Sequence, residues 1–358
     1  MSKANILVTR MGNIGDMLLI TPLLAAIKAN VSQSQVYVLS PKYSKEVLIR
    51  NPDVDYLFVF YTKMKRFRNR IHNMLLFNRL EKIYFDFLFC LDMDENVVSF
   101  LRRLPRIGTW IGFRRPAEVM RIWRENIHVA DNYLFLLKEL FPNESYTCFV
   151  ASCGSVDIEV YRKRPFFFVP RRQKEKIKSF LAQYGLFEPV LICPCASEFK
   201  PSRLWPTKNW IFLIQRLLKK VNIPIIVVSK NKKEKPIPEL YRCFYKKIYF
   251  WYNKSLTETA ALMSLAKTII CLDSGTLHLA TAVSTGKVIS LFGPSNPAHT
   301  GPYPEGVPQW KIVRNFSCQV GPCNTFPRER IPQECLYAEF TPCMEQINVE
   351  SVWRALLD

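Results

Sequence analysis

A chain of 358 residues that is 49% hydrophobic and 22% charged is too long for one typical domain and too apolar to be disordered. Its formal net charge of +20 favours a polyanionic partner, such as a phosphorylated substrate or an anionic membrane face, and no nucleic-acid-binding motif is present. It contains no apolar run of about 18 residues, which a membrane span requires, and its N-terminus lacks a signal-peptide core. We therefore expect a cytoplasmic protein.

The first half of the chain alternates between strand and helix patterns. Strands are expected at 6–8, 36–39, 56–60, 85–91 and 107–113, and helices at 17–28, 44–50, 69–82 and 132–140. This alternation predicts an α/β domain, in which a parallel sheet carries helices on both faces.

The pattern weakens over 142–164 and then restarts. Strands are expected at 190–193, 224–228, 268–272 and 288–292, and helices at 171–184, 209–220, 256–266 and 349–357. We divide the chain into a first domain at 1–160, a second at 161–345 and a C-terminal helix at 346–358. Two successive doubly wound domains predict a ligand-binding cleft between them.

The first candidate site follows the first strand and reads Arg10-Met-Gly12-Asn-Ile-Gly15-Asp16. Its two glycines form a tight turn that exposes backbone N–H groups. The third glycine of a dinucleotide-binding motif is absent, and the chain has no P-loop, so neither hydride transfer nor ATP hydrolysis is supported. Asp16 is either a helix cap or a general base, and its position alone favours the cap.

The second candidate is the loop from Pro194 to Pro206, which follows a buried strand. Its phosphate-binding side chains are Ser197, Lys200, Ser202 and Arg203. Composition leaves two interpretations open, an anion site and an ordinary β–α loop with exposed basic residues.

The third candidate is Asp273-Ser-Gly-Thr-Leu-His278, between the strand at 268–272 and a helix of small and apolar residues. Ser274 can cap this helix, and Gly275 lets a ligand approach the backbone. A helix N-terminus suits a phosphate, and Thr276 and His278 lie within its first turns. We expect a phosphorylated ligand here, at the carboxyl end of a parallel sheet.

Arginine and lysine clusters in the first half add a candidate anion-binding surface. They comprise the segment Lys63–Arg70 and the group Arg102, Arg103, Arg106, Arg114 and Arg115. The late cysteines, by contrast, are expected to be structural thiols, and no metal is expected. A metal site is the minority hypothesis, because the cysteines are not spaced as the tight pairs typical of metal ligands. These cysteines are Cys318, Cys323, Cys335 and Cys343.

The ordered set of motifs resembles glycosyltransferase family 9, the ADP-heptose:lipopolysaccharide heptosyltransferases. The matching segments are 6–16 with Thr21-Pro22, 200–210, 256–262, 273–280, 291–297 and Gly301-Pro302. Each motif alone is modest, but the ordered set is specific. The resemblance implies a GT-B fold of two Rossmann-like domains, with donor nucleotide on the second and acceptor on the first.

The resemblance also implies an inverting transfer of heptose from ADP-L-glycero-D-manno-heptose, with Asp16 as the general base and no further cofactor. The donor-binding residues are then Ser197, Lys200, Arg203, Asp273, Ser274, Gly275, Thr276 and His278. Arg203 stands where the family often has lysine. The acceptor-binding residues are Gly15, Lys63, Arg66, Arg106 and Arg114.

The implied partners are a nucleotide sugar and an anionic lipid A–core acceptor at the cytoplasmic face of the inner membrane, with which the enzyme associates peripherally. Two alternatives stay open. One is a GT-B enzyme that uses another nucleotide sugar, or a protein or capsule acceptor. The other, supported only by charge, is a non-enzymatic protein that binds nucleic acid or membrane.

Overall fold

The computed structural model describes residues 4–31, 33–63, 66–92, 94–113, 117, 119–120, 123–124, 127–137, 163–196, 201–220, 223–314, 318, 321–325, 328–329, 332–333, 335 and 338–358. The chain divides into two compact units, unit 1 at Met1–Phe168 and unit 2 at Val169–Asp358. The domain boundary expected at residue 160 lies outside the described residues.

Unit 1 is built on a six-stranded sheet with the order β3-β2-β1-β4-β5-β6, and neighbouring strands are parallel. The strands are β1 (Asn5–Thr9), β2 (Gln35–Pro41), β3 (Tyr56–Phe60), β4 (Phe85–Cys90), β5 (Ile107–Gly112) and β6 (Val119–Met120). The central strands are almost continuously buried, as expected for a sheet covered on both faces. This strand order is that of a Rossmann domain.

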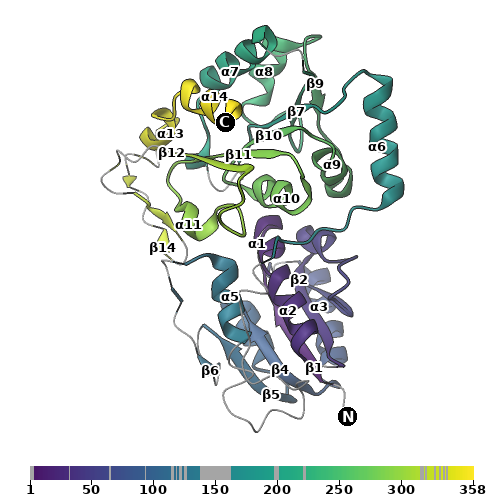
Figure 1. Ribbon diagram of the computed structural model, residues 1–358. Helices are drawn as coiled ribbons and strands as arrows, with labels where there is room; N and C mark the ends of the chain where they lie inside the picture. Colours follow the sequence, from purple (N-terminus) through teal and green to yellow (C-terminus); the bar gives the residue numbers. More distant parts are fainter. Residues whose placement is uncertain are drawn as a thin grey trace. The chain divides into compact units, whose positions relative to one another are not determined.

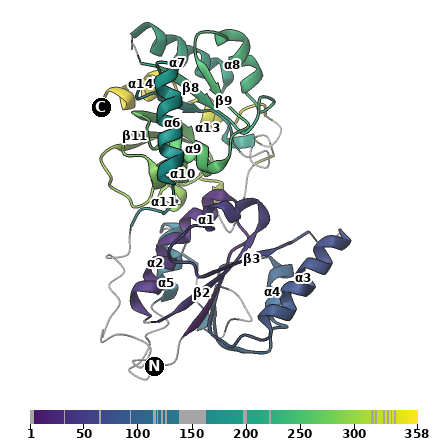
Figure 2. The same ribbon diagram turned by 90° about the vertical axis from the view of Figure 1, so that its right-hand side faces the viewer.

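Helices cover both faces of this sheet. They are α1 (Ile14–Leu19), α2 (Thr21–Asn30), α3 (Phe67–Leu80), α4 (Glu95–Leu101) and α5 (Val129–Leu137), with a 3₁₀ turn, η1, at Lys42–Val47. Figure 2 shows α2 and α5 on one face and α3 and α4 on the other.

The single helix expected at 17–28 is wrong, because the chain forms α1 and α2 in its place. Pro22 stands at the start of α2 and cannot donate a backbone hydrogen bond to the carbonyl four residues earlier. The Thr21 hydroxyl donates to that carbonyl, on Leu18, at 2.7 Å. The Thr21 hydroxyl therefore replaces the backbone donor that the Leu18 carbonyl lacks because residue 22 is a proline.

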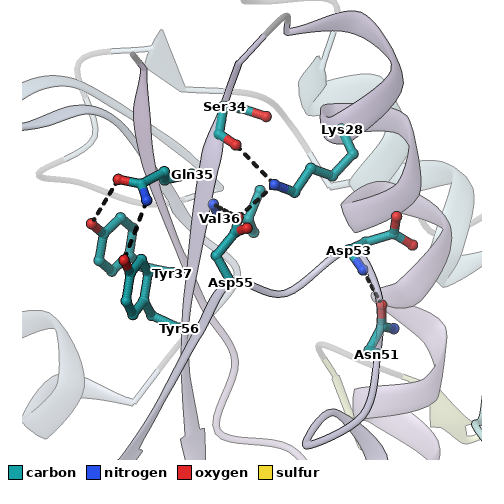
Figure 3. A network of polar contacts seen from close by, with 9 residues as sticks. All are labelled: Lys28, Ser34, Gln35, Val36, Tyr37, Asn51, Asp53, Asp55 and Tyr56. Atoms are coloured by element: carbon teal, nitrogen blue, oxygen red, sulfur yellow. Dashed lines mark hydrogen bonds and ion pairs between the residues drawn. The ribbon is translucent and has the colours of Figure 1, made fainter.

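A polar network fixes the outer strand β3 to the rest of the sheet (Figure 3). The Asp55 carboxylate accepts from the backbone N–H of Val36 at 2.6 Å and pairs with the Lys28 ammonium at 2.5 Å. Tyr37 and Tyr56 stack across the same pair of strands, with ring centroids 4.5 Å apart. These contacts set the register of β3, whose carboxyl end leads into α3.

Unit 2 repeats the architecture of unit 1. Its six-stranded parallel sheet has the order β12-β11-β10-β7-β8-β9, the same order as in unit 1 when the strands are numbered within the unit. The strands are β7 (Val190–Cys193), β8 (Ile225–Val228), β9 (Tyr249–Trp251), β10 (Thr268–Leu272), β11 (Lys287–Phe292) and β12 (Trp310–Arg314). A separate two-stranded ladder joins β13 (Asn324–Thr325) to β14 (Arg328–Glu329).

The helices of unit 2 also form two layers, with α7, α8 and α14 on one face and α6, α9 and α10 on the other (Figure 1). They are α6 (Arg171–Gln183), α7 (Thr207–Lys220), α8 (Ile237–Phe244), α9 (Leu256–Met263), α10 (Gly275–Val283), α11 (Pro297–Thr300), α13 (Pro342–Glu345) and α14 (Val349–Leu357), with the 3₁₀ turn η5 at Pro201–Arg203. The two units therefore confirm the expected α/β class. Among the described residues, no helix is long and apolar enough to cross a bilayer.

Candidate functional site

The candidate motifs lie where each sheet reverses its strand order. In unit 1 this point is between β1 and β4, and in unit 2 it is between β7 and β10. The helix that follows one of these two strands packs on one face of the sheet, and the helix that follows the other strand packs on the opposite face. A crevice therefore opens at the carboxyl ends of the two strands. The segment from Arg10 to Asp16 follows β1, Arg203 lies in the loop after β7, and Asp273 follows β10. Each unit thus gathers its candidate residues at the carboxyl edge of its sheet.

Asp16 lies in the first turn of α1, and both of its carboxylate oxygens are engaged. The Arg10 guanidinium donates to Oδ1 at 2.9 Å, and the Asn13 backbone N–H donates to Oδ2 at 2.8 Å. Asn13 and Asp16 form a capping box, so Asp16 does have the structural role that its position indicated. Its side chain is still 36% exposed. A carboxylate offers about four acceptor positions, so a further hydroxyl can bind to it.

Gly12 is required by the path of this loop. A Cβ atom at this position would lie 2.2 Å from the Asp16 Cβ. The Gly12 carbonyl also accepts from the buried Ser44 hydroxyl in η1, at 3.0 Å. The glycine therefore lets the loop fold tightly over the carboxylate that caps α1.

Arg10 links the ends of β1 and β4. It donates to the Leu91 carbonyl at 3.2 Å, while the buried Asp92 accepts from the backbone N–H of Met11. Burial alone lowers the pKa of Arg10, but Tyr133, Asp16 and Asp92 together raise it. Burial raises the pKa of Asp92, and the Arg10 charge opposes this rise. Asp16 is therefore the solvent-accessible carboxylate of this cluster and Asp92 the buried one.

Sequence reasoning missed three members of this cluster, Asp92, Tyr133 and Tyr43. Burial raises the pKa of Tyr133 to about 12, and burial followed by the charge of Asp16 raises the pKa of Tyr43. Tyr43 is largely exposed, so this phenol lies at the surface of the unit. The parallel order of β1 and β4 could have identified Asp92, whereas nothing local pointed to the tyrosines.

The predicted acceptor residues of unit 1 fall in different places. Gly15 is buried in the first turn of α1, and exposed Lys63 and Arg66 follow β3 at the carboxyl edge, the same edge as Asp16. Arg106 precedes β5 and therefore lies at the opposite, amino edge of the sheet. The structure does not bring Arg106 together with Asp16, and Arg114 lies outside the described residues.

In unit 2, a buried ion pair spans the crevice. Arg203 donates through Nη1 to the Asp273 carbonyl at 2.9 Å and pairs with the Asp273 carboxylate at 3.0 Å. The structure thus brings together residues of two candidate motifs that are 70 positions apart. A guanidinium has five N–H donors, and the buried Nε–H of Arg203 finds no acceptor among the described residues.

The start of α10 is not capped by a side chain. Ser274 occupies the N-cap position, but its hydroxyl bonds to the Thr276 hydroxyl at 2.6 Å and makes no capping bond. The helix therefore keeps backbone N–H donors beside Gly275 that Ser274 does not use. His278 lies one turn into α10, as expected, but it is buried, which limits its contact with a ligand.

The C-terminal segment holds the loop that carries Arg203. The Thr341 hydroxyl donates to the Ser202 carbonyl at 2.8 Å, and the Trp205 indole donates to the Ile347 carbonyl at 2.7 Å. Burial, followed by Glu234, raises the pKa of Cys195, so the loop after β8 approaches the loop after β7. The predicted residues Ser197 and Lys200 lie outside the described residues.

The four late cysteines lie among the described residues, and Cys318, Cys323 and Cys343 carry free thiols. Across the described part of the chain, no three His, Cys, Asp or Glu side chains are grouped so that they could hold a metal ion. The Cys343 thiol lies 3.3 Å from the Thr341 hydroxyl, beside the segment that holds the Arg203 loop.

Thiol reactivity should follow burial. Burial raises the pKa of Cys90 to about 11 and of Cys193 to about 12, whereas Cys243 is exposed. Because the thiolate is the nucleophile, iodoacetamide should modify Cys243 well before Cys90 and Cys193. Peptide mass spectrometry over time measures the order, and urea-unfolded protein, in which all three should react alike, is the control. Equal rates in the folded protein would contradict the buried placement of Cys193.

Comparison with known proteins agrees with this architecture. The chain is 23% identical to lipooligosaccharide heptosyltransferase 2 of Haemophilus influenzae, covering 83% of this chain and 86% of the relative. It is also 23% identical to lipopolysaccharide heptosyltransferase 2 of Escherichia coli, covering 81% and 82%.

Solved structures agree over nearly the whole chain. A family 9 glycosyl transferase from Veillonella parvula matches with a TM-score of 0.76 and 18% identity, covering 100% of this chain and 98% of the other. ADP-heptose lps heptosyltransferase II of E. coli matches at 0.71 and 18%, covering 99% and 97%. E. coli heptosyltransferase WaaC with ADP matches at 0.67 and 14%, covering 99% of each chain.

Two Rossmann-type units in succession, with these structural matches, define the GT-B fold. The profile of glycosyltransferase family 9 (heptosyltransferase) matches residues 158–325. Residues 158–325 therefore match glycosyltransferase family 9, and the chain as a whole is similar to heptosyltransferases.

Proposed function

We propose that this enzyme transfers heptose from ADP-L-glycero-D-manno-heptose to a lipopolysaccharide or lipooligosaccharide core acceptor, with inversion at C1. The observation that carries the proposal is the match, over more than four-fifths of each chain, to relatives that are heptosyltransferases of these glycolipids. The ADP complex of a protein with the same fold supports a nucleoside diphosphate donor.

We infer that unit 2 binds the donor diphosphate at the carboxyl ends of β7 and β10. The support is an arginine with unused donors, Arg203, beside the start of α10, where the Ser274 hydroxyl leaves backbone N–H groups uncapped. Charge develops on ADP as the bond from C1 to its phosphate oxygen breaks. Fixed N–H donors and a fixed cation stabilise that charge without reorganising during the reaction.

Asp16 is the proposed general base. Its carboxylate takes the proton of the acceptor hydroxyl, and the hydroxyl oxygen attacks C1 from the face opposite ADP. One bond to C1 forms while the other breaks, so the anomeric configuration inverts. Arg10 and the Asn13 N–H fix the carboxylate, and the partial exposure of Asp16 leaves it accessible to an acceptor, unlike buried Asp92.

A donor panel tests this function. ADP release should require both ADP-heptose and a heptose-free lipid A–core acceptor, and NMR of the product should show an inverted anomeric centre. The alternative donors are UDP-glucose and GDP-mannose, tested by turnover and by thermal shift, because a ligand of the native state raises the melting temperature. If UDP-glucose or GDP-mannose supports turnover and ADP-heptose does not, the proposed donor is wrong.

A further inference from the structure

Helix α3 presents an apolar stripe to solvent on the side opposite its packing face. Leu76 and Leu80 point into the core of unit 1. The exposed apolar residues are Phe67, Ile71, Met74 and Leu75. Their spacing of i, i+4, i+7 and i+8 places them on one face of the helix. The core of unit 1 does not use this stripe.

Basic residues border the stripe on both sides. At about 100° per residue, Arg68 and Arg70 flank it, and exposed Lys63 and Arg66 precede the helix. The helix contains no Asp or Glu. Cations near a helix N-terminus oppose the helix dipole, and among the described residues Arg66 and Arg68 form no ion pair. This arrangement weakens the isolated fold, and an external anion would offset that cost.

The stripe is carried on a firmly anchored element. The Asn73 side chain accepts from the Tyr61 backbone N–H at 3.1 Å and donates to the Tyr61 carbonyl at 2.9 Å, which fixes α3 to the end of β3. The Arg103 guanidinium lies over the Phe77 ring at 4.9 Å. Figure 2 shows α3 on the outer side of unit 1. The exposed side chains are therefore presented in a fixed geometry.

We propose that α3 docks unit 1 on the surface of an anionic phospholipid bilayer. Phe67 and Met74 enter the boundary between headgroups and acyl chains, and the flanking arginines bind lipid phosphates. An apolar face bordered by arginines is the pattern of helices that lie in a membrane interface. A second copy of this chain would bring the same cations against one another, and nucleic acid would leave the apolar stripe unused. Arg66 is also a predicted acceptor-binding residue, so docking is tested without donor or acceptor.

Vesicle co-sedimentation of the full chain tests this docking without donor or acceptor. The protein should sediment with vesicles of equimolar phosphatidylcholine and phosphatidylglycerol and stay in solution with phosphatidylcholine alone. Phe67→Ser with Met74→Ser should lower the partition coefficient by about tenfold or more, because less apolar area is buried. Arg66→Gln with Arg68→Gln should lower it on the order of thirtyfold, and added salt should lower it for the wild type.

The matched control is Phe187→Ser with Phe212→Ser in unit 2. These residues are 64% and 58% exposed, comparable with 74% for Phe67 and 57% for Met74. The control should bind vesicles like the wild type, and thermal unfolding should show that all variants are folded. Undiminished binding of the Phe67 and Met74 double variant, or an equal loss in the control, would overturn the docking proposal. Either result would leave the proposed transfer reaction untouched.

Discussion

Asp16→Asn should lower kcat about 10²- to 10⁴-fold while leaving ADP binding unchanged. The amide keeps an oxygen that can accept from the Asn13 N–H, so the cap geometry of α1 is largely retained. It cannot take the proton of an acceptor hydroxyl. Single-turnover measurement of ADP release, with ADP affinity from calorimetry, separates loss of chemistry from loss of donor binding.

Asp94→Asn is the matched control for Asp16. Asp94 also follows a strand of unit 1 and caps a helix, because its carboxylate accepts from the Asn96 backbone N–H at 2.8 Å at the start of α4. If Asp16 had only a structural role, both variants would show nearly full turnover, and Asp16→Asn would lose stability only through its ion pair with Arg10. Undiminished turnover in Asp16→Asn would therefore eliminate the proposed base and keep the capping role.

Arg203→Met should reduce the free energy of unfolding by about 3–5 kcal/mol, because it leaves the buried Asp273 carboxylate without its cation. Urea denaturation measures this loss. Arg203→Met combined with Asp273→Asn should recover most of the stability, since the unpaired charge is removed. The free energy of unfolding of these variants thus reports on the ion pair and not on donor binding.

ADP affinity separates the binding role of Arg203 from its structural role. The stable double variant should bind ADP about 10- to 100-fold more weakly, because it lacks charge-assisted hydrogen bonds to the diphosphate. Arg203→Lys keeps a cation but loses the planar fork, so an intermediate affinity is expected. A double variant that binds ADP like the wild type would remove Arg203 from the donor site.

The buried parallel strands were the most predictable elements. The strands expected at 190–193 and 268–272 have the observed bounds of β7 and β10, because strands covered on both faces are continuous apolar runs. By contrast, β9 and α8 were not predicted. β9 has only three residues, too few to show a period. The short helix α8 does carry a local signal that was overlooked, because Ile237, Leu240 and Phe244 follow the i, i+3, i+7 spacing of a buried helix face.

The residues of the candidate site could be predicted from the sequence, but the contacts between residues far apart in the chain could not. Local patterns put glycines, acids and basic residues at the ends of strands, and the structure places Arg203 and Asp273 in contact there. The Arg10 hydrogen bond to the end of β4 joins residues 81 positions apart, and no local pattern encodes such a contact. Arg106 was grouped with the acceptor-binding residues but lies at the amino edge of the sheet. Basic composition cannot distinguish the carboxyl edge of a sheet from the amino edge.

The anchoring of the Arg203 loop by the C-terminal segment has a consequence for how sequence variation in this enzyme should be interpreted. Thr341 and Ile347 hold the backbone at Ser202 and the indole of Trp205, on either side of the arginine. Substitutions near the end of the chain would therefore shift the guanidinium without any contact with the nucleotide. With Arg203 in the proposed donor site, divergence in this tail would alter donor binding at a distance, and comparisons restricted to ligand-contacting positions would overlook it.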